Sequence, residues 1–323
     1  MRRFGTGLIV MAIAAFTICV ARAQGYPTKP VRMVVPFAPG GGVDATARVL
    51  SQRFTEMWGQ QVIPDNRPGA GANIGADIVA HATPDGYTLL VTNNAIAISA
   101  GLYDRLDYNA LRDLQPISEI LRTPFVLVVS SKSPIKTVGD FVKTAAAKPG
   151  EVALANTGLG SGPHLAGVLF ANMTKTQLNH IPYKGGGPAI QDLAAGRVHA
   201  LFTTTLAAMP HVQAGRLRAL AVTSPTRWPS LPELPTVSES GVPGYDVMTW
   251  YMLLAPAKTP PAIVAKLQAD TATAVRHPLA EKVLGGEGGQ LVGGSSAEAT
   301  ALLKRETALW TKVIKEAGIK PHD

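Results

Sequence analysis

The feature that most constrains the fold is one segment, Val34–Arg48, in which a strand, a glycine loop and a helix follow one another. The β-favouring run Val31–Val35 comes first, and Pro36 ends it. Gly40–Gly42 then form a bare turn, and Asp44 begins a run whose apolar residues recur at helical spacing. Glycines let main-chain N–H groups approach a ligand, and a helix N-terminus adds partial positive charge. The segment therefore predicts either an anion-binding site or a plain βα turn that needs glycine.

The chain begins with a segment typical of a secretory signal peptide. Arg2 and Arg3 form its basic start, and Leu8–Val20 is an apolar stretch too short to span a bilayer comfortably. Ala21–Ala23 fits the small-x-small cleavage rule. We therefore expect residues 1–23 to be removed after Ala23 and the mature protein, from Gln24 on, to be periplasmic. No later segment is long and apolar enough to predict a membrane span.

Composition narrows the class of protein further. The only cysteine, Cys19, lies in the leader, so the mature chain has to rely on a hydrophobic core rather than on disulfides. Loss of Arg2, Arg3 and Arg22 would lower the formal charge from +8 to +5. Lysine and arginine are scattered and aromatic residues make up only 6%, so we expect no nucleic-acid partner. A weakly positive field suits small anionic ligands.

Strand-like and helix-like segments alternate along the chain, which predicts an α/β fold with mainly parallel strands and, at this length, two domains. The expected strands are Val31–Val35, Gln61–Ile63, Thr88–Val91, Phe125–Val129, Val152–Ala155, Ala200–Thr203, Leu217–Val222 and Met248–Leu254. The expected helices are Asp44–Trp58, Ala72–Ala80, Val138–Ala147, His164–Met173, Ala189–Leu193, Pro261–Val275, Pro278–Leu284 and Ala297–Ala317.

A second segment, Val152–Phe170, repeats the opening order of strand, glycine-rich loop and helix. It reads as the first βα unit of a second domain. Ligands of open α/β sheets bind beyond the carboxyl ends of the strands, so two such loops facing one another would form a cleft between domains. The long C-terminal helix Ala297–Ala317 is expected to pack on the first domain.

No complete catalytic constellation is present in the sequence, so we do not expect an enzyme, a cofactor or a metal. The glycines around Gly160 lack the spacing of a dinucleotide-binding motif. The segment around Lys184 lacks the Gly-Lys-Ser/Thr order of a P-loop. Ser161 lacks the glycine of a nucleophile elbow two residues before it. The histidines are dispersed, without a metal-ligand pair.

What remains is a set of loops rich in Gly, Asn, Thr and Ser, each following a predicted strand. Such loops supply neutral donors, which hold a carboxylate without an obligate ion pair. Taken singly, each loop could contain these residues only because they favour turns. Five loops of this composition at the carboxyl ends of predicted strands favour a ligand cleft. They are Phe37–Asp44, Thr92–Asn94, Asn156–Ser161, Tyr183–Gly187 and Thr203–Thr205.

Over nearly its whole mature length the chain resembles the substrate-binding component of tripartite tricarboxylate transporters, the Bordetella uptake gene (Bug) family of extracytoplasmic solute receptors. Each motif alone is weak, but their number and order are specific. The motifs are PFAPGGGVDATAR (Pro36–Arg48), NRPGAGANIGA (Asn66–Ala76), PDGYTLL (Pro84–Leu90), PYKGGGPAIQDLAAG (Pro182–Gly196), LRALAVTSPTR (Leu217–Arg227), LPELPTVSESGVPGYD (Leu231–Asp246) and LLAPAKTP (Leu253–Pro260).

The resemblance implies a two-domain periplasmic-binding-protein (Venus flytrap) fold, type II-like, with the ligand cleft between domains joined by two crossing strands. Domain 1 would comprise residues 24–125 and 248–323, and domain 2 residues 126–247. The implied ligand contacts are Phe37, Gly40, Gly41, Gly42, Asp44, Thr92, Asn93, Asn156, Thr157, Gly158, Ser161, Tyr183, Lys184, Gly185, Thr203 and Thr204. Helix capping is the other role open to Asp44.

The resemblance also implies the function: a monomeric receptor that closes on a small carboxylate and delivers it to the permease subunits of a tripartite tricarboxylate transporter. Two alternatives stay open, a ligand-sensing partner of a membrane histidine kinase and an exported hydrolase using Ser161 and His164. A ligand with a ring stacked on Phe37 and Tyr183 also fits. His199, where the family pattern favours an acidic or amide residue, bears on which ligand is bound.

Overall fold

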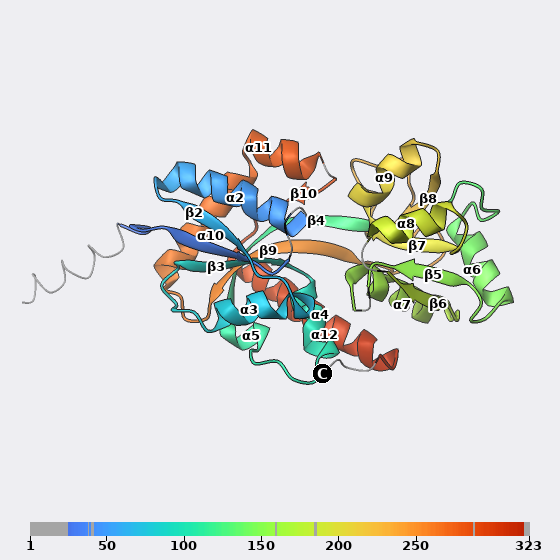
Figure 1. Cartoon of the computed structure of the whole chain (residues 1–323), viewed down its shortest axis with the longest axis horizontal. Helices are drawn as coiled ribbons and strands as arrows, with labels where there is room; N and C mark the ends of the chain where they lie inside the picture. Colours follow the sequence, from blue (N-terminus) through green and yellow to red (C-terminus); the bar gives the residue numbers. More distant parts are fainter. Residues whose placement is uncertain are drawn as a thin grey trace, which may run out of the picture.

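The computed structural model describes residues 25–319 except 38, 40, 41, 159, 184, 185 and 287. Gly40, Gly41, Lys184 and Gly185, four of the predicted ligand contacts, lie outside the described residues, as does the predicted leader. The chain forms two α/β lobes that share strands β4 (Leu114–Ser130) and β9 (Met248–Pro256), which run lengthwise between the lobes in Figure 1. The predicted two-domain α/β fold is confirmed.

The first lobe is built on parallel strands followed by helices. Strand β1 (Val31–Val35) pairs in parallel with β2 (Val62–Asn66) and β3 (Thr88–Asn93). β3 then pairs antiparallel with β9, and β9 with the first part of β4. The short strand β10 (Gln290–Leu291) adds to the far edge of β4. The predicted opening strand is therefore confirmed, and it lies between β2 and β3 in a mixed sheet.

The second lobe repeats this plan. Parallel strands β6 (Asn179–Pro182), β5 (Ala153–Asn156) and β7 (Ala200–Thr204) pair side by side, and the second part of β4 joins them through antiparallel pairing with β7. Strand β8 (Leu217–Val222) pairs with the same part of β4. β4 pairs with β9 as far as Pro124 and with β7 from Phe125 on, so one strand belongs to both sheets.

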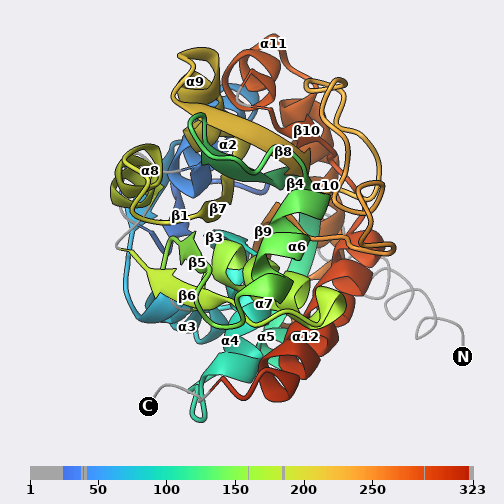
Figure 2. The same ribbon diagram turned by 90° about the vertical axis from the view of Figure 1, so that its right-hand side faces the viewer.

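Helices cover both faces of the sheets, and both Figure 1 and Figure 2 show helices above and below the strands. On one face of the first lobe lie α2 (Gly42–Trp58) and α10 (Pro261–Val275), with α11 (Pro278–Ala280) and the helical segment η2 (Glu281–Gly285) at its edge. On the other face lie η1 (Ala70–Ala72), α3 (Asn73–Ala80), α4 (Ala95–Leu102), α5 (Ala110–Asp113) and α12 (Ser296–Glu316). In the second lobe, α6 (Val138–Ala147) and α7 (Gly162–Thr174) face α8 (Gly186–Ala194) and α9 (Thr205–Gln213) across the sheet.

One hydrophobic core extends from the first lobe into the second. It joins Ile98 and Leu102 of α4 and Trp310 of α12 to Phe125 of β4 and Phe170 of α7, all buried. The predicted packing of the C-terminal helix on the first lobe is correct, because α12 contacts α4 and β4. It also contacts α7, so it supports both lobes from one side.

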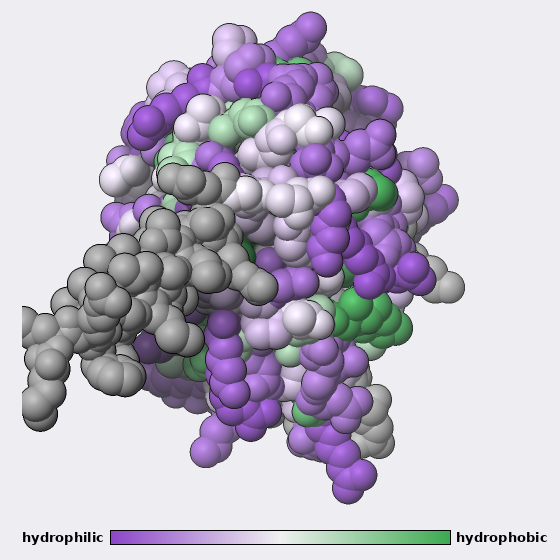
Figure 3. Space-filling view, turned by 90° about the vertical axis from the view of Figure 1, so that its left-hand side faces the viewer, coloured by the Kyte–Doolittle hydropathy of each residue, from purple (hydrophilic) through white to green (hydrophobic). Residues whose placement is uncertain are grey.

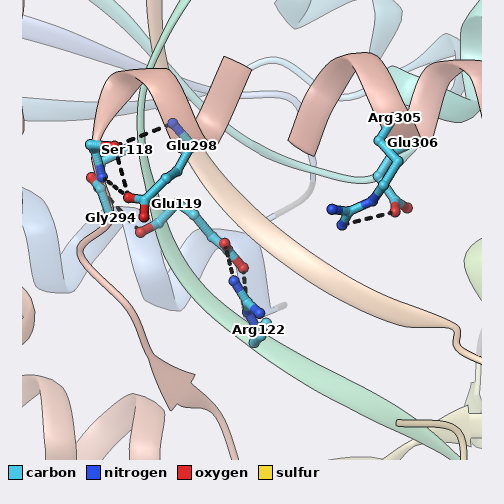
Figure 4. A network of polar contacts seen from close by, with 8 residues as sticks. Ser118, Glu119, Arg122, Gly294, Glu298, Arg305 and Glu306 are labelled. Atoms are coloured by element: carbon cyan, nitrogen blue, oxygen red, sulfur yellow. Dashed lines mark hydrogen bonds and ion pairs between the residues drawn. The ribbon is translucent and has the colours of Figure 1, made fainter. Parts of the chain in front are cut away.

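Polar contacts tie the start of α12 to the first part of β4, as Figure 4 shows. The Ser118 hydroxyl donates to the Gly294 carbonyl at 2.7 Å, and the Gly294 amide donates to the Glu119 carbonyl at 3.2 Å. Arg122 Nε donates to the buried Glu119 carboxylate at 2.7 Å. The first two bonds fix the segment before α12 to the middle of the first part of β4, and the third lies within β4.

The outer end of the first lobe, seen in Figure 3, is mostly hydrophilic, with hydrophobic residues in small patches. Among the described residues, no helix combines the length and apolar character that crossing a membrane requires.

Thr223 ties the crossing strands together, and its replacement tests how much they depend on it. Its buried hydroxyl accepts from the Phe125 amide at 2.8 Å and donates to the Val247 carbonyl at 2.6 Å. Thr223→Val keeps the shape but leaves both groups unpaired, so we expect the free energy of unfolding to fall by about 2–4 kcal/mol in urea titrations. Thr273→Val, on the exposed side of α10, serves as the control. An equal loss in both variants would contradict this role.

Candidate functional site

A cavity of about 540 Å³ lies between the lobes, at the carboxyl ends of the parallel strands of both. This is where open α/β sheets bind ligands. The first lobe contributes residues that follow β1 and β3, and the second lobe contributes residues that follow β5 and β7. Strands β4 and β9 form the side that joins them, through Phe125, Thr249 and Tyr251. A volume of this size suits a small molecule.

Four helices begin at this cavity, one from the first lobe and three from the second. Asn94 precedes α4, Ser161 caps α7, Gly186 begins α8 and Thr204 caps α9, and all four line the cavity. Each helix N-terminus carries about +0.5 of a charge and main-chain N–H groups without intrahelical partners. No charged side chain is among the described residues that line the cavity. The arrangement therefore favours an anion held by neutral donors.

Two buried amide groups strengthen this preference. The Asn94 carboxamide oxygen accepts from the Thr249 hydroxyl at 3.2 Å, while its NH2 group finds no partner within the described part of the chain. The Asn156 carboxamide oxygen accepts from the Gly158 amide at 3.0 Å, and its NH2 group likewise has none there. Both side chains are at least 97% buried, since 3% and 1% remain exposed. An unpaired buried donor costs free energy, which an anionic ligand would recover.

The loop before α7 is held in shape by its own hydrogen bonds. The Ser161 hydroxyl donates to the Gly158 carbonyl at 2.7 Å and accepts from the His164 amide at 3.3 Å. The Gly160 amide donates to Nδ1 of His164 at 3.0 Å. Gly158 and Gly160 have φ angles of 133° and 72°, which side chains rarely adopt. Glycine here serves the turn, and the turn fixes the donors.

These contacts bear on the hydrolase alternative. In the described loop the Ser161 hydroxyl is occupied as a helix cap, and Nδ1 of His164 accepts from the Gly160 main chain rather than from that hydroxyl. A serine nucleophile needs its base within hydrogen-bond reach. The geometry makes Ser161 and His164 a structural pair.

The structure brings many of the predicted ligand contacts together, and it adds residues that the sequence did not indicate. The predicted residues that line the cavity are Phe37, Asn93, Thr157, Gly158, Ser161, Thr203 and Thr204. Gly42 lines an adjoining cavity of about 90 Å³ that shares Thr204 and Tyr251. The lining residues that prediction missed include Ile98, Ser99, Leu102, Tyr103, Phe125, Gly162, Thr249 and Tyr251. In the sequence, only the neighbouring glycine-rich and asparagine-rich loops indicated a binding site near these residues.

Other predicted contacts are engaged elsewhere. The buried Asp44 carboxylate accepts from Asn66 at 2.9 Å and from Arg48 at 2.8 Å, and the Tyr183 hydroxyl donates to Asp192 at 2.8 Å. Thr92 is fully buried in β3, and its hydroxyl has no partner among the described residues. Neither these three residues nor Asn156 lines the cavity, so their contact with ligand stays a prediction. His199 accepts from the Ala153 amide, at the opposite end of β5 from the cavity.

Comparison with known proteins agrees with this geometry. The model of the tripartite tricarboxylate transporter family receptor matches residues 46–319. The chain is 38% identical over 309 residues to the UPF0065 protein in the tcbD-tcbE intergenic region of Pseudomonas sp. strain P51, covering 95% of this chain and 92% of that protein. It is 36% identical over 300 residues to BugT of Bordetella pertussis, covering 92% of each.

Among solved structures, R. palustris Rpa4515 with adipate matches with a TM-score of 0.81 at 38% identity, covering 92% of this chain and 100% of that one. The fold is therefore that of the periplasmic binding proteins, with a ligand cleft between two lobes. The chain belongs to the tripartite tricarboxylate transporter receptor family and is a relative of the Bug proteins. That family consists of solute-binding receptors.

His164 gives the site a testable pH dependence. Burial, and then the nearby ring of His180, lower the pKa of His164 from 6.5 to about 4. Because the folded pKa lies below the unfolded one, its stabilising contribution is complete above pH 6.5 and is lost as pH falls toward 4. We expect the wild type to lose up to about 3 kcal/mol more stability over this range than His164→Asn, which keeps an acceptor for Gly160.

The measurement is urea unfolding at several pH values between 4 and 7. His81→Asn, at an exposed position on the first lobe, is the control and should keep the wild-type profile. Parallel profiles for the wild type and His164→Asn would contradict a buried neutral imidazole.

Proposed function

We propose that the mature protein is a periplasmic receptor that binds a small carboxylate between its lobes and delivers it to the membrane subunits of a tripartite tricarboxylate transporter. One observation carries the proposal: helix N-termini from both lobes and the buried amide donor of Asn94 face one cavity whose described lining holds no charge. A carboxylate satisfies such donors, and the adipate bound by Rpa4515 supports this class of ligand.

Closure of the lobes is the mechanism that this arrangement supports. The first lobe would comprise residues 24–125 and 248–323, and the second residues 126–247, with β4 and β9 as the connections. A ligand that touches Asn94 in one lobe and the loop at Ser161 in the other gains both sets of contacts only when the lobes are together. Binding then shifts the population toward the closed form by that difference in affinity.

The remaining parts of the proposal follow from the leader and the family. Residues 1–23 would direct export and be removed after Ala23, leaving a monomer in the periplasm. The loaded, closed monomer would then be recognised by the permease. The proposal also keeps four predicted ligand contacts that lie outside the described residues: Gly40, Gly41, Lys184 and Gly185.

Asn94 provides the sharpest test of anion binding. Asn94→Asp replaces the unpartnered NH2 donor by a carboxylate oxygen without changing the size of the side chain. Repulsion and the lost donor should weaken binding of the carboxylate that most stabilises the wild type by about 100-fold or more, as measured by calorimetry. Asn172→Asp, exposed on α7, should bind as the wild type does. Equal affinities in all three proteins would refute the proposed contact.

Delivery to a transporter is tested separately in cells. Deleting the gene should abolish concentrative uptake of the labelled ligand, and the wild-type copy should restore it while the Asn94→Asp copy does not. If uptake persists and only transcription of ligand-induced genes is lost, the protein senses the ligand for a membrane kinase instead.

A further inference from the structure

The cavity between the lobes has an apolar wall as well as donors. Ile98, Leu102 and Phe125 line it, and they are at most 5% exposed because the rest of each side chain lies in the shared core. Phe37 and Tyr251 add partly buried aromatic rings. These five side chains lie in a lining that otherwise consists of small residues and neutral polar groups.

Helix α4 sets the wall against the anion site. Asn94, Ile98 and Leu102 are spaced at i, i+4 and i+8, so they share one face of the helix. At 1.5 Å per residue, that face runs about 12 Å from the Asn94 amide to Leu102. A ligand whose carboxylate meets Asn94 therefore lays the next part of its body along Ile98 and Leu102.

The wall also lies close to the donors of the second lobe. A Cβ built on Gly160 would come within 2.2 Å of Leu102, and one built on Gly162 within 2.7 Å of the Phe125 ring. Leu102 and Phe125 thus pack directly against the loop and the first turn of α7. The donors of α7 and the hydrocarbon surface therefore adjoin.

We propose, building on the receptor function above, that the ligand is a carboxylate whose body is unsubstituted hydrocarbon, aliphatic or aromatic, and that hydroxylated carboxylates are excluded. The side chains of Ile98, Leu102 and Phe125 offer a ligand hydroxyl no hydrogen bond to replace those it loses to water, and the hydroxyl groups of the lining lie on other residues. A third carboxylate would meet the same wall, with no charged side chain to pair with it among the described lining residues. The apolar wall therefore selects the body of the ligand, while the helix N-termini select its charge.

Calorimetry on the mature wild-type protein with adipate and galactarate tests the proposal. These ligands share a six-carbon chain and two carboxylates and differ only in four hydroxyl groups, and benzoate and citrate extend the comparison. We expect the tighter of adipate and benzoate to bind at least 100-fold more tightly than galactarate or citrate. If galactarate or citrate binds as tightly as the tighter of adipate and benzoate, the proposal is overturned and the receptor function stays intact. Binding of none of the four would overturn this proposal, and the Asn94→Asp series with other carboxylates would then decide the receptor function.

Leu102 provides the matched variants. Leu102→Gln, which places an amide on the wall, should weaken binding of the preferred ligand about 10-fold and reduce the ratio of its affinity to that of galactarate. Leu102→Met should keep both the affinity and the ratio. Circular dichroism and thermal unfolding check that each variant folds, and Phe37→Gln tests the same wall at a less buried position. Unchanged ratios in folded Leu102→Gln and Phe37→Gln would show that the wall does not select the ligand.

Discussion

Strand β4 is the constraint on which the rest of the structure depends. It forms backbone hydrogen bonds with β9 and β10 in the first lobe and with β7 and β8 in the second. Buried backbone groups have to be paired, so the two sheets cannot separate without breaking this strand's ladders. The point where β4 changes partners, Pro124 to Phe125, therefore fixes where the lobes meet, and Phe125 itself lines the cavity. Phe125 therefore belongs both to the strand that joins the two sheets and to the wall of the cavity.

The sequence predicted the site best where backbone chemistry demands particular residues. Gly158 and Gly160 adopt positive φ angles, and Ser161 and Thr204 cap helices, so glycine, serine and threonine mark these loops whatever the ligand is. The parallel strands β1, β3, β5 and β7 were located as well, since a short, largely apolar run precedes each of these loops.

The apolar half of the site could not be predicted in this way. Helix α4 is almost entirely apolar, with small residues at its less buried positions Ala95, Ala100 and Gly101, so its sequence shows no clear helical periodicity. It was missed together with α5, α9, β6 and β10. Its residues Ile98 and Leu102 look like any core residues in the sequence, and only the tertiary structure shows that they face a cavity. Strand β4 was also predicted too short, since only Phe125–Val129 was expected as a strand. Its first part contains Pro116 and Pro124, which cannot donate backbone hydrogen bonds, and its pairing with β9 shifts register next to Pro116.

A site of this construction separates two tasks that are often combined in one side chain. In the proposed binding mode, the charge of the ligand would be met by helix N-termini and by the Asn94 amide, which the fold itself supplies and which do not titrate near neutral pH. Its shape would be met by side chains on α4 and β4, which are different residues from the donors although they pack beside them. Selection can therefore change the ligand by altering Leu102 or Phe125 while it keeps the carboxylate anchor. The glycine loops are then the constant part of such a receptor, and its specificity lies in residues that sequence motifs do not mark.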